Sequence, residues 1–164
     1  MFPKRLAFIT RERKSEIMEM LAYYGIKSLS GYLLTESGTE KIRAYSGSLS
    51  AEQLHEINQE VSIELIGLYL LHYYPTNIRL SFDAVNALKK EITQNILELD
   101  DKQAEEFLKG RDVALNEEEK KALEIKGDTC GFKILKHKND FIGTGKLTQE
   151  GRIVNYMPKE RRLR

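Results

Sequence analysis

The stretch GFKILKHKNDFIGTGKLTQEGRIVNYMPKERRLR, residues 131–164, decides how the rest of the chain is interpreted. Short apolar runs alternate there with polar turns, as in antiparallel strands, and the stretch ends in a run of cations. Nine basic and three acidic residues give it a net charge of +6, whereas the whole chain of 164 residues carries +1. The remainder therefore carries −5. Because the charge is segregated in this way, we expect a polyanion to bind this end of the chain.

Composition limits the class of protein. With 41% hydrophobic and 31% charged residues, the chain is typical of a globular protein of one domain or two small ones. The longest apolar run, residues 63–74, is shorter than the roughly 20 residues that cross a bilayer, so we expect no membrane partner. The basic start MFPKRLAFITRERK lacks a secretory cleavage pattern, and the single cysteine, Cys130, excludes an internal disulfide. Both features favour a reducing, cytoplasmic location.

Two helices are predicted in the first sixty residues. Apolar residues at i, i+3, i+4 and i+7 predict a helix over residues 15–24 that ends at Gly25. Ser50 with Gln53 forms a capping box, which predicts a second helix. Its buried stripe is expected to consist of Leu54, Ile57 and Val61.

Strands are predicted around these helices. Residues 29–35 and 41–45 form a hairpin pair, and residues 63–74 fit either a central strand or a buried helix. Residues 78–82 alternate as a strand does, and a helix follows from Asp83. Residues 96–99 indicate a short strand, although helical spacing also fits them.

The predicted second domain begins near the end of a short helix that Asp100 or Asp101 caps and Gly110 ends. A strand, a helix with a capping box at Asn116 and Glu119, and a three-stranded meander follow. We therefore expect a mixed α/β (α+β) fold. An N-terminal α/β domain covers residues 1–106, and a small C-terminal β-barrel covers residues 107–164.

This second domain resembles a known family. The order of strand, helix and hairpins, with FLKGRDV at residues 107–113 and FIGTGK at residues 141–146, resembles a PUA domain, the RNA-binding module of pseudouridine synthases and archaeosine transglycosylases. The preceding IRLSFDAVNAL (residues 78–88) and EEFLKG (residues 105–110) are similar to the two-domain proteins of pre-rRNA processing and ribosome biogenesis, which join a pre-PUA domain to a PUA domain. The PKERR run (residues 158–162) instead resembles the PUA-like tails of some RNA cytosine methyltransferases, so the subfamily stays open.

The resemblance implies an RNA partner, either rRNA or tRNA, and a groove between the short helix and the strand after it. Lys109, Gly110 and Arg111 would lie at the mouth of this groove, where glycine lets backbone approach phosphate. Alternation along the strand places Lys133 away from Phe132 and Ile134.

Further cations are expected on the outer side of the meander. A bulge or twist at residues 135–138 would turn two lysines to one side, and Lys146 would face Arg152 if the last hairpin turns about Glu150. Tyr156 is either a base-stacking platform or a core residue, and the terminal cations either complete the patch or form a tail. The candidate RNA-binding residues are Lys109, Gly110, Arg111, Lys136, Lys138, Lys146, Arg152, Lys159, Arg161 and Arg162.

Catalytic signatures are missing from the sequence. It contains no GxGxxG before a helix, no GxxxxGK[ST], no CxxC and no HExxH, and its three histidines fall in separate elements. We therefore expect no catalytic residue, no cofactor and no metal site. The function predicted is non-catalytic RNA binding, with a protein partner or a second RNA surface for the N-terminal domain. The alternatives are an accessory subunit or degenerate relative of an RNA-modifying enzyme, such as an RNA methyltransferase, and a protein-interaction adaptor with a basic tail.

Overall fold

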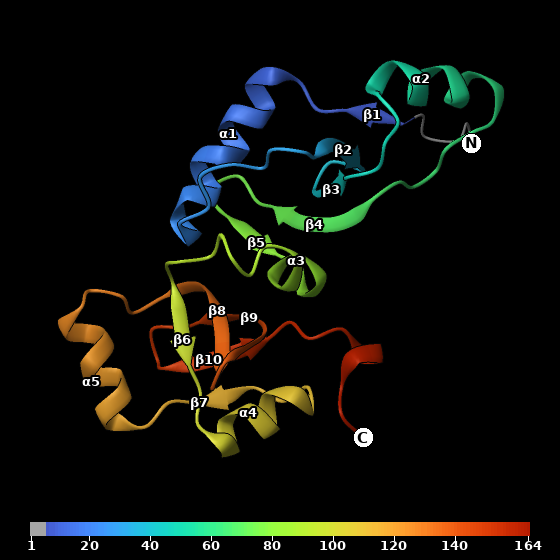
Figure 1. Ribbon diagram of the computed structural model, residues 1–164. Helices are drawn as coiled ribbons and strands as arrows, with labels where there is room; N and C mark the ends of the chain where they lie inside the picture. Colours follow the sequence, from blue (N-terminus) through green and yellow to red (C-terminus); the bar gives the residue numbers. More distant parts are fainter. Residues whose placement is uncertain (1–5) are drawn as a thin grey trace. The chain divides into compact units, whose positions relative to one another are not determined.

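The computed structural model describes residues 6–164. The chain divides into two compact units after Ala84, and the second unit is Val85–Arg164 (Figure 1). The first five residues of the basic start lie outside the described residues. The predicted boundary after residue 106 lies inside the second unit, and the strand at residues 96–98 belongs to the C-terminal sheet. Each unit carries its own five-stranded sheet.

The sheet of the first unit is an antiparallel meander whose strands follow one another in chain order. The predicted hairpin at its centre is present, and residues 63–74, for which both strand and helix were possible, contain a strand from residue 68. The strands are β1 (Ala7–Phe8), β2 (Leu33–Ser37), β3 (Lys41–Tyr45), β4 (Leu68–Tyr73) and β5 (Ile78–Leu80).

The first helix, α1 (Arg11–Leu21), begins four residues earlier than predicted. Thr10 caps it, because its side-chain oxygen accepts a hydrogen bond from the Arg13 N–H at 3.1 Å. A 3-10 turn, η1 (Ala22–Tyr24), continues it, and Gly25 ends it at φ 79° as expected. Its inward face packs on the sheet, where the Tyr24 hydroxyl donates to the Ile78 carbonyl at 2.9 Å.

The second helix, α2 (Ala51–Glu60), starts with the predicted capping box between Ser50 and Gln53. Its predicted buried stripe is only partly correct. Leu54 is buried, but Ile57 and Val61 are 38% and 61% exposed. Leu54 is thus the buried residue of α2.

The sheet of the second unit is curled into a half-barrel, in the order β6–β8–β9–β10–β7 (Figure 1). Its strands are β6 (Ile96–Glu98), β7 (Val113–Ala114), β8 (Gly131–His137), β9 (Asp140–Leu147) and β10 (Arg152–Asn155). β6 runs parallel to β8, and all other pairs are antiparallel. The mixed α/β fold with a C-terminal β-barrel-like unit is thus confirmed.

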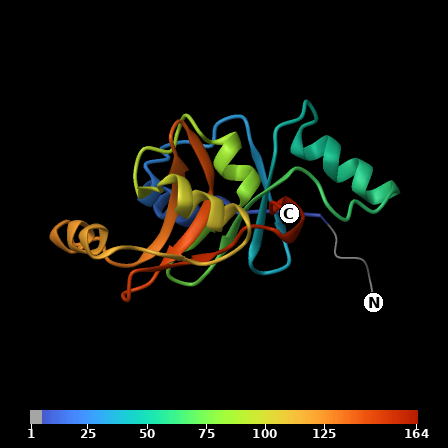
Figure 2. The same ribbon diagram turned by 90° about the horizontal axis from the view of Figure 1, so that it is seen from below.

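Helices flank this second sheet. α4 (Asp101–Leu108) has Asp100 as its N-cap, and α5 (Glu117–Ile125) has the predicted box of Asn116 and Glu119. α4 inserts Phe107, which is fully buried, into the core of the half-barrel. α5 has no buried residue and stands at the edge of the unit (Figure 2). The remaining elements are α3 (Phe82–Ala87) and η2 (Lys159–Arg161).

Candidate nucleic-acid interface

The groove mouth predicted at Lys109, Gly110 and Arg111 is the C-terminal end of α4. Gly110 has φ 84°, its N–H bonds the Phe107 carbonyl at 2.9 Å, and the Arg111 N–H bonds the Glu106 carbonyl at 3.0 Å. These two bonds form a Schellman motif, which needs a residue in the left-handed region. The local sequence therefore fixes the turn that presents the two cations.

The final residues of the chain are ordered against this turn. The Leu163 N–H donates to the Leu108 carbonyl at 2.8 Å, and Arg162 Nε donates to the Met157 carbonyl at 3.2 Å. A Cβ added at Gly110 would lie 2.3 Å from Arg162 Cδ. The surface of Gly110 that we expected to meet phosphate therefore carries the Arg162 side chain, and residues 158–162 are part of the folded unit.

Asn155 links the last strand to the same turn. Its side-chain nitrogen donates to the carbonyls of Phe107 and Arg111, both at 2.7 Å, and its own N–H donates to Asp112 Oδ1 at 2.9 Å. Arg152 lies near Asp112 at 3.7 Å. Four predicted cations thus gather around the end of α4. We call Lys109, Arg111, Arg152 and Arg162 the helix-end cluster.

Two further predicted lysines lie at the other end of α4. Lys138 Nζ is 2.7 Å from Asp101, and Lys136 Nζ is 4.0 Å from Glu98. The predicted irregularity is confirmed, because the pairing of β8 with β9 shifts between Leu135 and Lys136, and Lys138 has φ 55°. We call Lys136 and Lys138 the helix-start cluster.

Carboxylates neutralise both clusters in part. Lys109 contacts Glu105, and Arg111 donates to Glu106 at 2.9 Å. The hydrogen bond from Lys109 lowers the pKa of Glu105, and that from Lys138, followed by that from His137, lowers the pKa of Asp101. Asp101 and Glu105 are exposed, and ion pairs between exposed groups contribute little to stability. A phosphate can therefore replace them at small cost.

The last hairpin does not place Lys146 opposite Arg152. Lys146 pairs with Val154, and Arg152 pairs with Ala114 on β7. The reason is the turn: the N–H of Thr148 bonds the Arg152 carbonyl at 2.8 Å, so Thr148 and not Lys146 lies across from Arg152. The two cations still share one face of the sheet, because residues 152 and 154 are two apart on one strand.

Lys133 lies in the interior of the second unit. It is 1% exposed, its ammonium contacts Asp128, and it donates to Asn95 Oδ1 at 2.9 Å. Because the curled sheet is covered on both sides here, Phe132 and Ile134 are buried as well. Lys133 therefore belongs to the core and is not available to phosphate.

The remaining candidates are on the outer surface. Lys146 is exposed, with its Nζ 5.9 Å from the Phe132 ring, and the Phe132 ring in turn meets Tyr156 edge-on at 5.7 Å. Tyr156 is half-buried in this contact. Lys159 and Arg161 lie on η2, and both are exposed.

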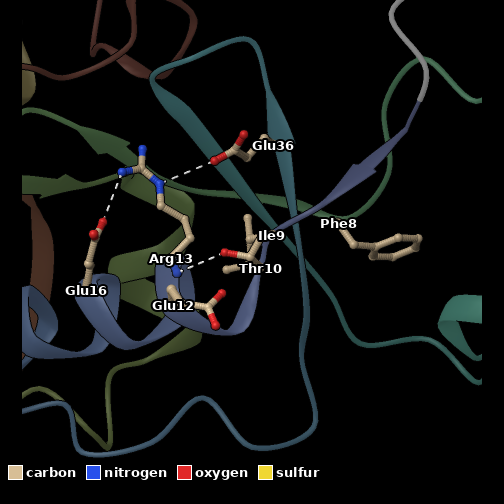
Figure 3. A pocket seen from close by; sticks show the side chains of 7 residues that line it. All are labelled: Phe8, Ile9, Thr10, Glu12, Arg13, Glu16 and Glu36. Carbon is tan, nitrogen blue, oxygen red and sulfur yellow. Dashed lines mark hydrogen bonds and ion pairs between the residues drawn. The ribbon is translucent and has the colours of Figure 1, made fainter.

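A surface depression lies in the first unit, at the start of α1 (Figure 3). Its volume is about 430 Å³. Arg13 is the cation there, and it is shared between Glu16 and Glu36, both at 3.3 Å, with Glu12 also on the rim. Because two carboxylates already pair with this guanidinium, the depression is unfavourable for a phosphate.

The described part of the chain offers neither a metal site nor a membrane span. Within residues 6–164, no three His, Cys, Asp or Glu side chains converge in a way that suits a metal ion. No helix in the same part of the chain is both long and apolar enough to cross a membrane.

Comparison with known families decides what the second unit is. Residues 94–163 match the family described as "Methyltransferase RsmF PUA domain". The second unit carries a PUA domain of this type. The matched range includes β6 and α4, in agreement with the sheet topology, and the predicted PUA resemblance is confirmed. Of the two subfamilies considered, the match favours the RNA methyltransferase tails. None of the curated proteins matches the chain significantly.

Proposed function

We propose that this protein binds structured RNA, either rRNA or tRNA, through its PUA domain and catalyses no reaction itself. The observation that carries the proposal is the match of residues 94–163 to the PUA domain of an RNA methyltransferase. It acts during RNA modification or ribosome biogenesis, in the cytoplasm, where an exposed Cys130 stays reduced. The first unit contributes a contact with a protein partner or with a second part of the RNA.

The spacing of the two cation clusters supports this proposal. α4 spans 8 residues, so the clusters at its ends are roughly 12 Å apart at about 1.5 Å per residue. One strand of a B-form DNA duplex advances about 3.4 Å per phosphate along the axis. On that scale, the distance between the clusters corresponds to roughly three or four phosphates of one strand of a duplex.

Salt dependence tests the proposal. We would measure the affinity of the whole chain for an RNA hairpin between about 50 and 200 mM salt. In the variant K136Q/K138Q/K159Q/R161Q, the log–log slope should fall by about 0.7–0.9 for each phosphate that is no longer neutralised. Arg162 is kept in this variant because it packs on Gly110.

The matched control is K27Q/K90Q/K121Q/K126Q, which removes the same charge from exposed lysines elsewhere. We expect the control to keep the wild-type slope to within about 0.9, the value for a single phosphate. Equal slopes in the wild type and in both variants would contradict RNA binding by this surface.

A second candidate function is that of an accessory subunit of an RNA methyltransferase. The family match supports it, because the matched PUA domain is described as part of a methyltransferase. In that case the protein should increase methyl transfer from S-adenosylmethionine to RNA in an extract from cells that lack it. Crosslinking in cells separates the candidates: an RNA-binding protein and an accessory subunit recover RNA at different sites, whereas a protein-interaction adaptor recovers little.

A further inference from the structure

The sheet of the first unit has a second face, directed away from α1, whose composition differs from that of the α1 side. An irregularity builds it: Ile42 on β3 pairs with Leu71, but the next residue, Arg43, pairs with Tyr69, so Leu70 is an extra residue in β4. A bulge of this kind re-aims the side chains beside it. Tyr69 and His72, which plain alternation would place on opposite faces, therefore share one face.

Aromatic rings and cations meet on this face. His72 is paired with Lys41 on one side and with Arg79 on the other. The His72 and Tyr74 ring centroids are 4.5 Å apart, and Lys41 Nζ is 5.9 Å from the centre of the Tyr69 ring. We call Lys41, Tyr69, His72, Tyr74 and Arg79 the Tyr–Arg face.

Buried neighbours hold the Tyr–Arg face in place, and its outer side is partly exposed to solvent. Leu70 and Leu71 are 1% and 0% exposed, which anchors β4 in the core. The Tyr69 carbonyl accepts a hydrogen bond from the Ser81 hydroxyl. Tyr69, His72, Tyr74 and Arg79 are half-buried, and Lys41 is exposed. The rings are therefore fixed in position while part of each remains accessible.

The charge of the Tyr–Arg face is positive. Lys41 and Arg79 lie within it, and Arg43 borders it with its guanidinium on the Gly67 carbonyl at 2.6 Å. Glu40 contacts the face through His72, at 3.4 Å. Arg79 and Lys41 both lower the pKa of His72, after burial, which has the largest effect. On the α1 side of the same sheet, by contrast, the carboxylates of Glu16 and Glu36 both pair with Arg13 (Figure 3).

We propose that the Tyr–Arg face binds unstacked bases of single-stranded RNA, as a second RNA site in addition to the PUA domain; the inference builds on the function proposed above. Recognition of single-stranded RNA combines aromatic rings, on which bases stack, with cations that follow the phosphates. A tyrosine–histidine–tyrosine surface between Lys41 and Arg79 offers both. An unpaired segment of the RNA whose duplex part binds the PUA domain is the ligand that fits.

Binding of two RNA probes to the whole chain tests this assignment. The first probe is a fluorescent uridine dodecamer, which has no stable structure, and the second is an RNA hairpin. In Y69L/Y74L, which keeps the apolar bulk but removes the rings, we expect the dodecamer affinity to fall at least roughly five-fold per ring. The hairpin affinity should change by less than about two-fold.

The matched control is Y23L/Y32L, which removes two tyrosines of the same unit outside the face. A fall in dodecamer affinity confined to Y69L/Y74L supports the site. Unchanged dodecamer affinity in folded Y69L/Y74L overturns it. The variant K136Q/K138Q/K159Q/R161Q reports on the PUA domain separately. If this variant loses affinity for both probes while Y69L/Y74L keeps its affinity for both, RNA binding by the PUA domain is supported and the second site is excluded.

Crosslinking of RNA to the wild-type protein tests the same site without relying on the folding of variants. A dodecamer containing 4-thiouridine would be crosslinked by light and the attached peptide identified by mass spectrometry. We expect crosslinks within residues 68–74. Crosslinks found solely within residues 94–163 overturn the inference and leave RNA binding by the PUA domain intact.

Discussion

At the scale of single residues, Gly110 determines both where α4 ends and how Arg162 packs. Its φ of 84° ends α4, and its missing Cβ makes room for Arg162. Gly110→Ala should lower the free energy of unfolding by about 1–2 kcal/mol, because an L-residue is strained in this region and the Arg162 side chain must move. Urea unfolding measures the change.

Gly127→Ala is the matched control for this substitution. Gly127 has φ 68° and no heavy atom within 4 Å of an added Cβ, so it carries the same backbone strain without the contact. The difference between the two variants therefore isolates the packing of Arg162. If the two variants lose equal stability, the C-terminal segment contributes nothing at Gly110.

His72 predicts a dependence of stability on pH. Its pKa is lowered from 6.5, first by burial and then by Arg79 and Lys41, while Glu40 opposes the shift. The unfolded chain therefore binds the proton more readily, so the contribution is fully present above about pH 6.5 and is lost as the pH falls toward the folded-state pKa. Between pH 7 and 5, His72→Asn should lose stability less steeply than the wild type in urea titrations. His55→Asn, at an exposed histidine of α2, should keep the wild-type dependence, and equal slopes in all three proteins would exclude the effect.

Single residues also mark where prediction from sequence stops. Alternation places Lys133 on the side of β8 away from its apolar neighbours but does not say whether that side is covered. The side is buried, and Asp128 and Asn95, which belong to other segments of the chain, supply the partners that make burial of an ammonium tolerable. Nothing in the local pattern of β8 encodes this.

At the scale of elements, the pair of Lys133 and Asp128 fastens the loop before β8 to the sheet. The two partners differ in burial, since the side chain of Lys133 is 1% exposed and that of Asp128 is 39% exposed. Asp128→Asn leaves a buried ammonium without its counter-charge and should cost roughly 3 kcal/mol. Lys133→Met leaves a carboxylate that water can solvate, and should cost about 1 kcal/mol. Chemical denaturation compares the two. A larger loss in Lys133→Met would mean that the ion pair does not hold the loop.

Element boundaries were predictable where a local hydrogen bond defines them. The boxes at Ser50, Asn116 and the helix start at Asp100 are all present, because capping depends on residues three apart in sequence. Burial of α2 was mispredicted at Ile57 and Val61, since periodicity names an apolar face but not what covers it. The parallel pairing of β6 with β8 joins residues about forty apart, which no local pattern specifies.

At the scale of the whole molecule, the fold class and the PUA domain were within reach of the sequence, but the grouping of the site was not. The ten candidate residues gather mainly at the two ends of α4, through contacts such as that of Arg162 with Gly110. The Tyr–Arg face was missed because its residues share a face only through the bulge at Leu70. The available signal was the histidine between tyrosines in the run LYLLHYYP, residues 68–75. Alternation alone would place Tyr69 and His72 on opposite faces of the sheet.

The division of the chain yields the last prediction. A fragment of residues 85–164 should fold alone with a cooperative thermal transition, because it contains the whole second sheet and α4. A fragment of residues 107–164, cut at the boundary expected from sequence, should not. It lacks β6, whose neighbours Asn95 and Leu99 bond Ile134 and Lys136 on β8, and it lacks the apolar side chains of Leu99 and Ala104. Its edge strand and core would then be open to water. Circular dichroism and heteronuclear NMR distinguish the two outcomes, and a folded 107–164 fragment would restore the boundary after residue 106 and remove α4 from the RNA-binding unit.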